Sequence, residues 1–228
     1  MKIVRLAGLV SAAIMAVSLV AVSAAFAAPE FNPSSKVLLL GTSATSTLSA
    51  GSGTENVSCA TDTSHGEITS ATLAGNITVH FLNCKGTNAA GATCLVKSEG
   101  APTGNLIITK TLHGLLGLVL GEGTNSASDV GLLLLPGSGK QFVTLQGSCL
   151  AGGETIVTGL VAGLLEPIGK LVHTAKLVLT VKGTSQAITD IDVSGGSLVT
   201  PKLTAFSTGA TEQATEEILF DGPLLEVT

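Results

Sequence analysis

The chain of 228 residues has no tryptophan and no tyrosine, and its only arginine is Arg5. These three residue types are enriched at the binding hot spots of protein interfaces. Their scarcity disfavours an interface anchored by arginine or large aromatic rings, and it disfavours a sugar site built on aromatic platforms. A tight protein contact would have to use phenylalanine and aliphatic side chains, or add a strand to an exposed sheet edge.

Residues 1–28 have the three-part composition of a secretory signal peptide. Residues 1–5 are basic, residues 6–22 are mainly apolar, and small residues then lead to an A-x-A pattern before Pro29. This order is typical of a cleaved export signal. We therefore expect a bacterial protein that is secreted, extracellular or associated with the cell envelope. Later apolar stretches fall short of the roughly 20 residues that a spanning helix requires, so we expect no membrane span in the mature form.

Basic side chains are also scarce. The chain has 11 Lys and Arg residues against 16 Asp and Glu residues, a net charge of −5. Cleavage after residue 28 would remove Lys2 and Arg5 but no acidic residue, which leaves a net charge of −7. A negative chain with scattered lysines is poorly suited to follow a phosphate backbone, so we expect no nucleic-acid partner.

Four cysteines, Cys59, Cys84, Cys94 and Cys149, lie in the part of the chain that would be exported. An even number of cysteines in an oxidising compartment predicts disulfides. Of the three possible pairings we predict Cys59–Cys149 together with Cys84–Cys94. The second pair follows from a glycine-containing loop at 85–93, where a hairpin would bring the flanking strands together. The close C-x2-C spacing of zinc sites is missing, so we predict no metal site.

Apolar and polar residues alternate with a period of two in several segments, including 77–81, 176–182 and 190–193. This period is typical of half-buried antiparallel strands. Turn residues recur at the spacing of about 8–12 residues that favours a sandwich or barrel. We predict an all-β fold, an antiparallel β-sandwich or distorted barrel stapled by disulfides, with at most one short helix. The candidate for that helix is 211–220, where a strand is equally plausible.

The predicted domain organisation is simple. Residues 29–36, with Pro29 and Pro33, are predicted to be a mobile lead after the signal peptide. Residues 37–228 are predicted to form a single β domain, which is long enough to bury a core of mainly aliphatic side chains. The leucine-rich segment 115–120 is predicted to be a strand that is buried on both faces and pairs with 130–135.

Candidate catalytic patterns are weak. Residues 62–65 read Asp-Thr-Ser-His and contain the three residue types of a serine triad. A triad is defined by its geometry in space, however, and the chain has no G-x-S-x-G motif. Glu67, Glu99 and Glu166 could supply the two carboxylates of a glycosidase, whose separation the sequence does not show.

Candidate binding patterns are no stronger. Asp190 and Asp192 share a strand face and could approach one cation, but calcium takes six to eight oxygen ligands. The four histidines lack metal-binding spacing. Residues 136–141 half-resemble a phosphate loop but lack its first glycine and its final Ser or Thr, so a hairpin turn is predicted there. We predict no catalytic residue and no cofactor.

The pattern of cysteines, turns and strands resembles that of a group of secreted β-rich proteins of actinobacterial type, for which no activity is established. The residues that carry this resemblance are Cys59, 66–72, 81–84, Cys94, 98–102, 131–136 and Cys149. The resemblance implies an exported β fold and assigns no catalytic residue.

We predict a secreted, non-catalytic structural or binding β protein, with an envelope or protein partner held by a sheet edge or by apolar contact. Two alternatives are a secreted hydrolase and a carrier of a small apolar ligand. The carrier is suggested by the leucines in 112–135 and 160–165, which could equally be core. A pocket joining a His, a Ser and a carboxylate would indicate an enzyme, and an apolar cavity would indicate a carrier.

Overall fold

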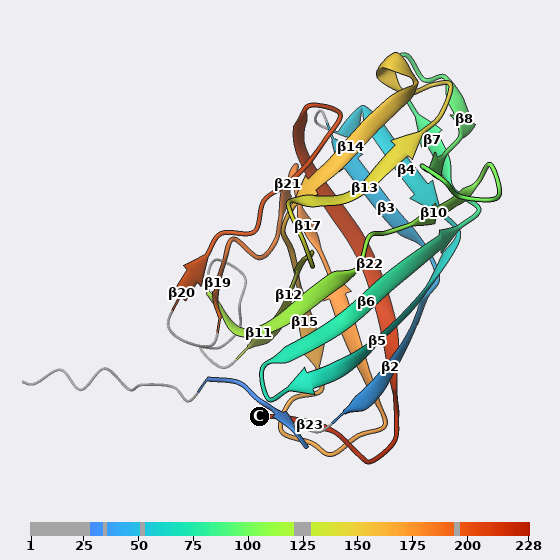
Figure 1. The fold of residues 1–228 in the computed structure, drawn as a ribbon. Helices are drawn as coiled ribbons and strands as arrows, with labels where there is room; N and C mark the ends of the chain where they lie inside the picture. The colour runs from blue at the N-terminus through green and yellow to red at the C-terminus, as the bar shows by residue number, and fades with distance from the viewer. Residues whose placement is uncertain (1–27, 34–35, 51–52, 121–128, 194–196) are drawn as a thin grey trace, which may run out of the picture.

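The structure is a computed structural model that describes residues 28–33, 36–50, 53–120, 129–193 and 197–228 (Figure 1). The predicted signal peptide, residues 1–28, lies outside the described residues except for Ala28. Within these ranges no helix is both long enough and apolar enough to cross a membrane.

The described residues are mostly in β-strands, which confirms the predicted all-β class. In β2 (Val37–Ser43) buried and exposed side chains alternate, as they do in any sheet with one face in the core. The same alternation runs through β22 (Thr208–Asp221), so the segment considered for a short helix is a strand. The described residues contain no α-helix, and η2 (Ala151–Gly153) is a short 3₁₀ turn.

Eight antiparallel strands pair in a sequence that returns to its starting strand. The pairing passes from β2 to β5 (Thr61–Ser70), β6 (Leu73–Leu82), β11 (Leu112–Leu120), β12 (Val130–Pro136), β15 (Val161–Glu166), β16 (Thr174–Leu179) and β22, which pairs with β2 again. We call these strands the ring. Because the pairing closes, the inward side chains of its strands share one interior.

β22 is long enough to continue beyond the ring into a second group of strands, in the upper part of Figure 1. On one side of β22 lie β3 (Ser46–Ala50), β4 (Glu55–Cys59), β7 (Lys85–Thr87) and β8 (Thr93–Leu95). On the other side lie β21 (Leu203–Ala205), β14 (Glu154–Gly159), β13 (Gln141–Gln146) and β9 (Lys97–Ser98). β10 (Leu106–Ile108) pairs with β6. One apolar cluster extends through the ring and this second group.

The predicted pairing of β11 with β12 is confirmed, with Leu116 opposite Leu132. β11 is buried on both faces, as predicted, because Leu116 joins the main core while Val119 joins a second apolar cluster with Ile191. Two further strands lie beside the ring at this second cluster. β19 (Asp190–Val193) pairs with β11 of the ring and with β20 (Ser197–Val199). A two-strand hairpin, β17 (Val181–Lys182) and β18 (Ser185–Gln186), precedes them.

The mobile lead predicted at 29–36 is corrected in its first half. β1 (Phe31–Asn32) pairs with β23 (Glu226–Val227) near the C-terminus. Phe31 is 5% exposed and belongs to the main core. Burial removes the large apolar surface of its side chain from water, which favours this position over a solvent-exposed one. Residues 34 and 35 lie outside the described residues.

The predicted cysteine pairing is wrong, since the disulfides join Cys59 to Cys84 and Cys94 to Cys149. β4 continues into β5 and β6 continues into β7, so one long hairpin sets Cys59 opposite Cys84. The expected β7–β8 hairpin forms, but its register places Cys94 opposite Gly86, two residues beyond Cys84. Cys94 therefore bonds to Cys149, in the connection between β13 and β14. All four cysteines are in disulfides, as predicted.

Candidate functional site: a cavity lined by three carboxyl groups

Three carboxyl groups line one cavity, where the ring meets the second group of strands. β22 turns its even-numbered side chains inward, and these include Glu212 and Glu216. β5 contributes Asp62 from the other side of β2. Ser43 of β2 is the register partner of both Asp62 and Glu216, so the pairing order of three strands brings these residues together.

Two of the carboxyl groups accept hydrogen bonds from serines. The Ser43 hydroxyl donates to Asp62 Oδ2, and the Ser64 hydroxyl donates to Glu216 Oε1. Glu212 has no hydrogen-bond partner among the described residues. Its carboxyl group is therefore available to a molecule in the interior.

Burial raises the pKa of all three carboxyl groups. It raises the pKa of Glu212 to about 8, and the negative charge of Asp62 adds to this effect. Burial raises the pKa of Glu216 to about 7, against the lowering effect of the Ser64 hydrogen bond and with some repulsion from Asp62. The pKa of Asp62 is raised by burial and lowered in part by Ser43. Glu212 retains some accessible surface because its side chain borders a cavity.

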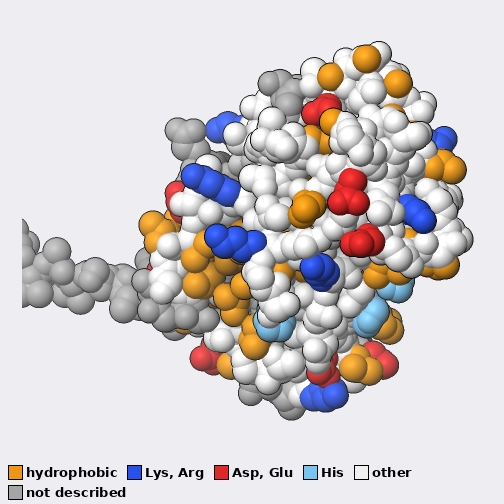
Figure 2. Space-filling model, turned by 45° about the horizontal axis from the view of Figure 1, so that its top comes forward, with side chains coloured by type: hydrophobic (Ala, Val, Ile, Leu, Met, Phe, Trp, Pro, Cys, Tyr) orange, Lys and Arg blue, Asp and Glu red, His pale blue; other side chains and the backbone are white. Residues whose placement is uncertain are grey.

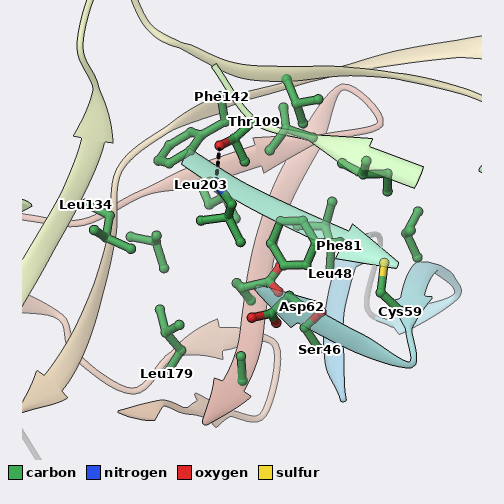
Figure 3. Close-up of a pocket in the computed structure, with 18 of the residues that line it drawn as sticks. Ser46, Leu48, Cys59, Asp62, Phe81, Thr109, Leu134, Phe142, Leu179 and Leu203 are labelled. Atoms are coloured by element: carbon green, nitrogen blue, oxygen red, sulfur yellow. Dashed lines mark hydrogen bonds between the residues drawn. The ribbon is translucent and has the colours of Figure 1, made fainter. Parts of the chain in front are cut away.

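The cavity has a volume of about 110 Å³. Figure 3 shows apolar side chains around it, drawn from strands of the ring and of the second group. The labelled apolar residues are Leu48, Phe81, Leu134, Phe142, Leu179 and Leu203. Among its few polar groups, the Thr109 hydroxyl accepts a hydrogen bond from the Val79 amide at 3.0 Å. The cavity is thus an apolar space with its acidic groups gathered on β5 and β22.

No lysine, arginine or histidine is among the residues that line the cavity in the described ranges. The carboxyl groups therefore lack a cationic partner from the protein. Nor do the described residues hold a group of three His, Cys, Asp or Glu side chains placed to bind one metal ion. Chemically, the site can accept hydrogen bonds from a donor in the cavity, and it can exchange protons.

The Asp-Thr-Ser-His segment at 62–65 is split between the two faces of β5. Asp62 and Ser64 point into the ring, whereas His65 is exposed on the outer face. There His65 packs edge-to-face against His80 of β6, with ring centroids 5.9 Å apart. Histidine side chains are visible on the surface in Figure 2. The strand period therefore separates the serine from the histidine that a triad would require.

The other acidic candidates are not brought together. Glu67 forms an ion pair with Lys36 at 2.7 Å, while Glu99 and Glu166 are exposed on other elements. Asp190 accepts a hydrogen bond from Thr200 at 2.7 Å. The neighbouring Asp192 has one buried carboxylate oxygen with no hydrogen-bond partner among the described residues.

The segment 136–141 is a turn between β12 and β13, and it is not the hairpin that was predicted. β13 pairs with β14 and β9, while β12 pairs with β11 and β15. The turn therefore carries the chain out of the ring and into the second group of strands.

Gly41 makes room for one of the buried hydrogen bonds. An ideal Cβ built on this residue would overlap the carboxylate of Glu216 and the hydroxyl of Ser64. Gly41 is the register partner of Ser64 on β5 and of Ile218 on β22. A side chain at this position would therefore occupy the space in which the Ser64–Glu216 bond forms.

We expect Gly41→Ala to lower the free energy of unfolding by ~1–3 kcal/mol, because it overfills the core and displaces a buried hydrogen bond. Urea unfolding at pH 7 measures the change. Gly209→Ala on β22 is the matched control, since no atom of the described residues lies within 4 Å of its Cβ position. The control should be neutral or slightly stabilising. Equal effects of the two substitutions would contradict the assignment of Gly41.

Glu212 and Glu216 are the site residues that sequence reasoning missed. The signal for them was present: with 211–220 taken as a strand, its even positions place Glu212 and Glu216 on the same face as Ile218 and Phe220. Two glutamates on an apolar strand face indicate a functional site, because an unpaired carboxylate is costly to bury.

The chain was also compared with known proteins. No protein-family model, no curated protein and no solved structure matches it. The function is therefore inferred from the residues around the cavity.

Proposed function

We propose that this protein is a secreted, non-catalytic binding protein that holds a small, largely apolar molecule in the cavity between its strand ring and its second group of strands. The observation that carries the proposal is the cavity itself, about 110 Å³ of space with mainly apolar walls. Protein interiors are close-packed, with few voids larger than a water molecule. A purely structural protein gains nothing from such a space, whereas a carrier requires it.

The size of the cavity limits the ligand. A cavity of about 150 Å³ in another protein binds benzene. A space of about 110 Å³ suits a molecule smaller than benzene, with only a few non-hydrogen atoms. A lipid chain or a sugar would not fit without rearrangement of the ring.

The arrangement around the cavity favours binding over hydrolysis. Ser64, one of the serines near the acidic groups, donates its hydroxyl hydrogen to Glu216. His65 lies on the opposite face of β5 and so cannot act as a base for Ser64. Export is supported by the N-terminal composition and by the two disulfides, which are typical of oxidising compartments.

Xenon tests the proposal because it enters apolar cavities regardless of ligand chemistry. We expect xenon pressure to shift the methyl NMR signals of residues that line the cavity, such as Leu134 and Leu179. Ala214→Leu should abolish these shifts, because Ala214 lies on the cavity wall and the larger side chain fills the space. Thr215→Leu is the matched control, since Thr215 faces outward on the same strand. No xenon response in the unmodified protein would overturn the proposal.

A further inference from the structure

We propose that the molecule held in the cavity is a small organic ammonium ion, with its cationic head at the Glu212 carboxyl group, on the acidic side of the cavity that Asp62 and Glu216 also line, and its hydrocarbon body against the apolar wall. This inference rests on the proposed binding function and names the chemical class of ligand.

The charges around the cavity favour a cationic ligand. Three acidic groups line the same cavity, Asp62 and Glu216 share Ser43 as their register partner, and the negative charge of Asp62 raises the pKa of Glu212 and of Glu216. The strands packed against β22 here, β3, β16 and β21, contribute Ser46, Leu179 and Leu203, none of which is charged. The described lining residues thus supply no positive charge, and a bound cation would remove this repulsion.

The hydrogen bonds around the cavity favour a ligand that donates hydrogen bonds. Asp62 and Glu216 each have a serine donor, and Glu212 has none among the described residues. An ammonium group has up to three N–H donors and no acceptor, so it matches carboxylates that still need donors. A neutral apolar molecule would leave Glu212 without a partner in an apolar space, which is unfavourable.

The rest of the wall argues for an organic cation over a metal ion. Hard metal ions such as Ca²⁺ take six to eight oxygen ligands. The cavity offers an acidic side on β5 and β22 and apolar residues, including Leu134 and Phe142, elsewhere. In the described part of the chain, no three acidic, His or Cys side chains are placed to hold one metal. A ligand with one charged end and one hydrocarbon end fits both sides.

Proton release should accompany binding. The raised pKa values of Glu212 and Glu216 keep both groups largely protonated at pH 5, and both lose protons as the pH approaches 8. A bound ammonium favours the carboxylate forms, so affinity for it should rise with pH over this range. An alkyl amine stays protonated throughout, because its pKa lies near that of lysine.

Butylamine and 1-butanol form a matched pair of probes, with the same length and different charge. In methyl NMR titrations at pH 8 we expect butylamine to bind at least about tenfold more tightly than 1-butanol, from charge-assisted hydrogen bonds. At pH 5 the preference should shrink. Glu212→Gln should remove most of this preference at pH 8, read as the ratio of the butylamine and 1-butanol affinities of the same variant. Glu217→Gln, on the outward face of β22, is the control and should change neither.

The outcomes separate this inference from the proposed function. If xenon and 1-butanol bind but butylamine binds no more tightly, the ammonium assignment is wrong and the carrier function stands. If none of the three enters the cavity, both are wrong. Displacement of butylamine by millimolar CaCl₂ would reassign the carboxyl groups to a metal ion and would also overturn the inference. The amine and alcohol comparison in the unmodified protein keeps the test decisive even if a variant does not fold.

Discussion

The protein should lose several kcal/mol of stability as the pH rises from about 5 to about 8. The unfolded chain releases the protons of Glu212 and Glu216 near the ordinary glutamate pKa of 4.5, whereas the folded protein keeps them until about 8 and about 7. Below pH 4.5 both states are protonated and neither group affects folding. Above it the unfolded state ionises first, so stability falls until the folded carboxyl groups ionise as well. For Glu212 the full difference corresponds to at most about 5 kcal/mol.

Glutamine tests this expectation because it resembles the protonated form of glutamate at every pH. We expect Glu212→Gln to unfold at higher denaturant than the unmodified protein at pH 8, and at about the same denaturant near pH 4. Glu216→Gln should also raise the stability at pH 8, but by less than Glu212→Gln. The pKa of Glu216 is raised less than that of Glu212, and the hydrogen bond from Ser64 stabilises the charged form of Glu216. Glu217→Gln is the exposed control on the same strand.

Guanidinium chloride unfolding at intervals from pH 4 to pH 9 measures the effect, since the ionic denaturant also screens surface charges. A stability that stays constant between pH 5 and pH 8 would contradict the raised pKa values. A fall that persists unchanged in a variant carrying both Glu212→Gln and Glu216→Gln would assign the pH dependence to other groups.

The strands could be predicted from the sequence because each depends on a local pattern. The period of two at Ile77–Val79 and at Ile191–Val193 survives as alternating burial in β6 and β19. The pairing of β11 with β12 was also accessible, since the two strands are neighbours along the chain. The segment 211–220 was ambiguous from its local sequence, because it contains helix-forming residues. In the structure it is a strand, because its pairing with β2, β3 and β16 outweighs their helix propensity.

The site could not be predicted, because its residues come from distant segments. Asp62 and Glu216 meet only because β2 pairs with both β5 and β22. That pairing order depends on the whole topology and leaves no mark in local spacing. The cysteine pairing failed for a related reason. The β7–β8 hairpin was predicted, but the register that sets Cys94 opposite Gly86 is fixed by the longer hairpin of β5 and β6.

Loss of the Cys94–Cys149 disulfide should lower the free energy of unfolding by about 4 kcal/mol. The bond closes a loop of 55 residues, which restricts the unfolded chain more than the 25 residues closed by Cys59–Cys84. The loop-entropy relation gives about 4 kcal/mol for the first loop and about 3.5 kcal/mol for the second. We therefore expect Cys94→Ser/Cys149→Ser to unfold at lower denaturant than Cys59→Ser/Cys84→Ser, with both less stable than the unmodified protein.

The two bonds should also differ in where their loss is felt. Cys94 on β8 ties the end of the second strand group to the connection between β13 and β14, and no ring strand holds either cysteine. Hydrogen exchange in Cys94→Ser/Cys149→Ser should therefore quicken in β7 and β8 and stay slow in β2 and β22. Cys59 lies on the cavity wall, as Asp62 does, so loss of its bond should also weaken the binding of xenon and butylamine. Faster exchange in the ring after loss of Cys94–Cys149 would show that the ring and the second group unfold as one unit. The ring strands alone would then not be enough to hold the carboxyl groups in place.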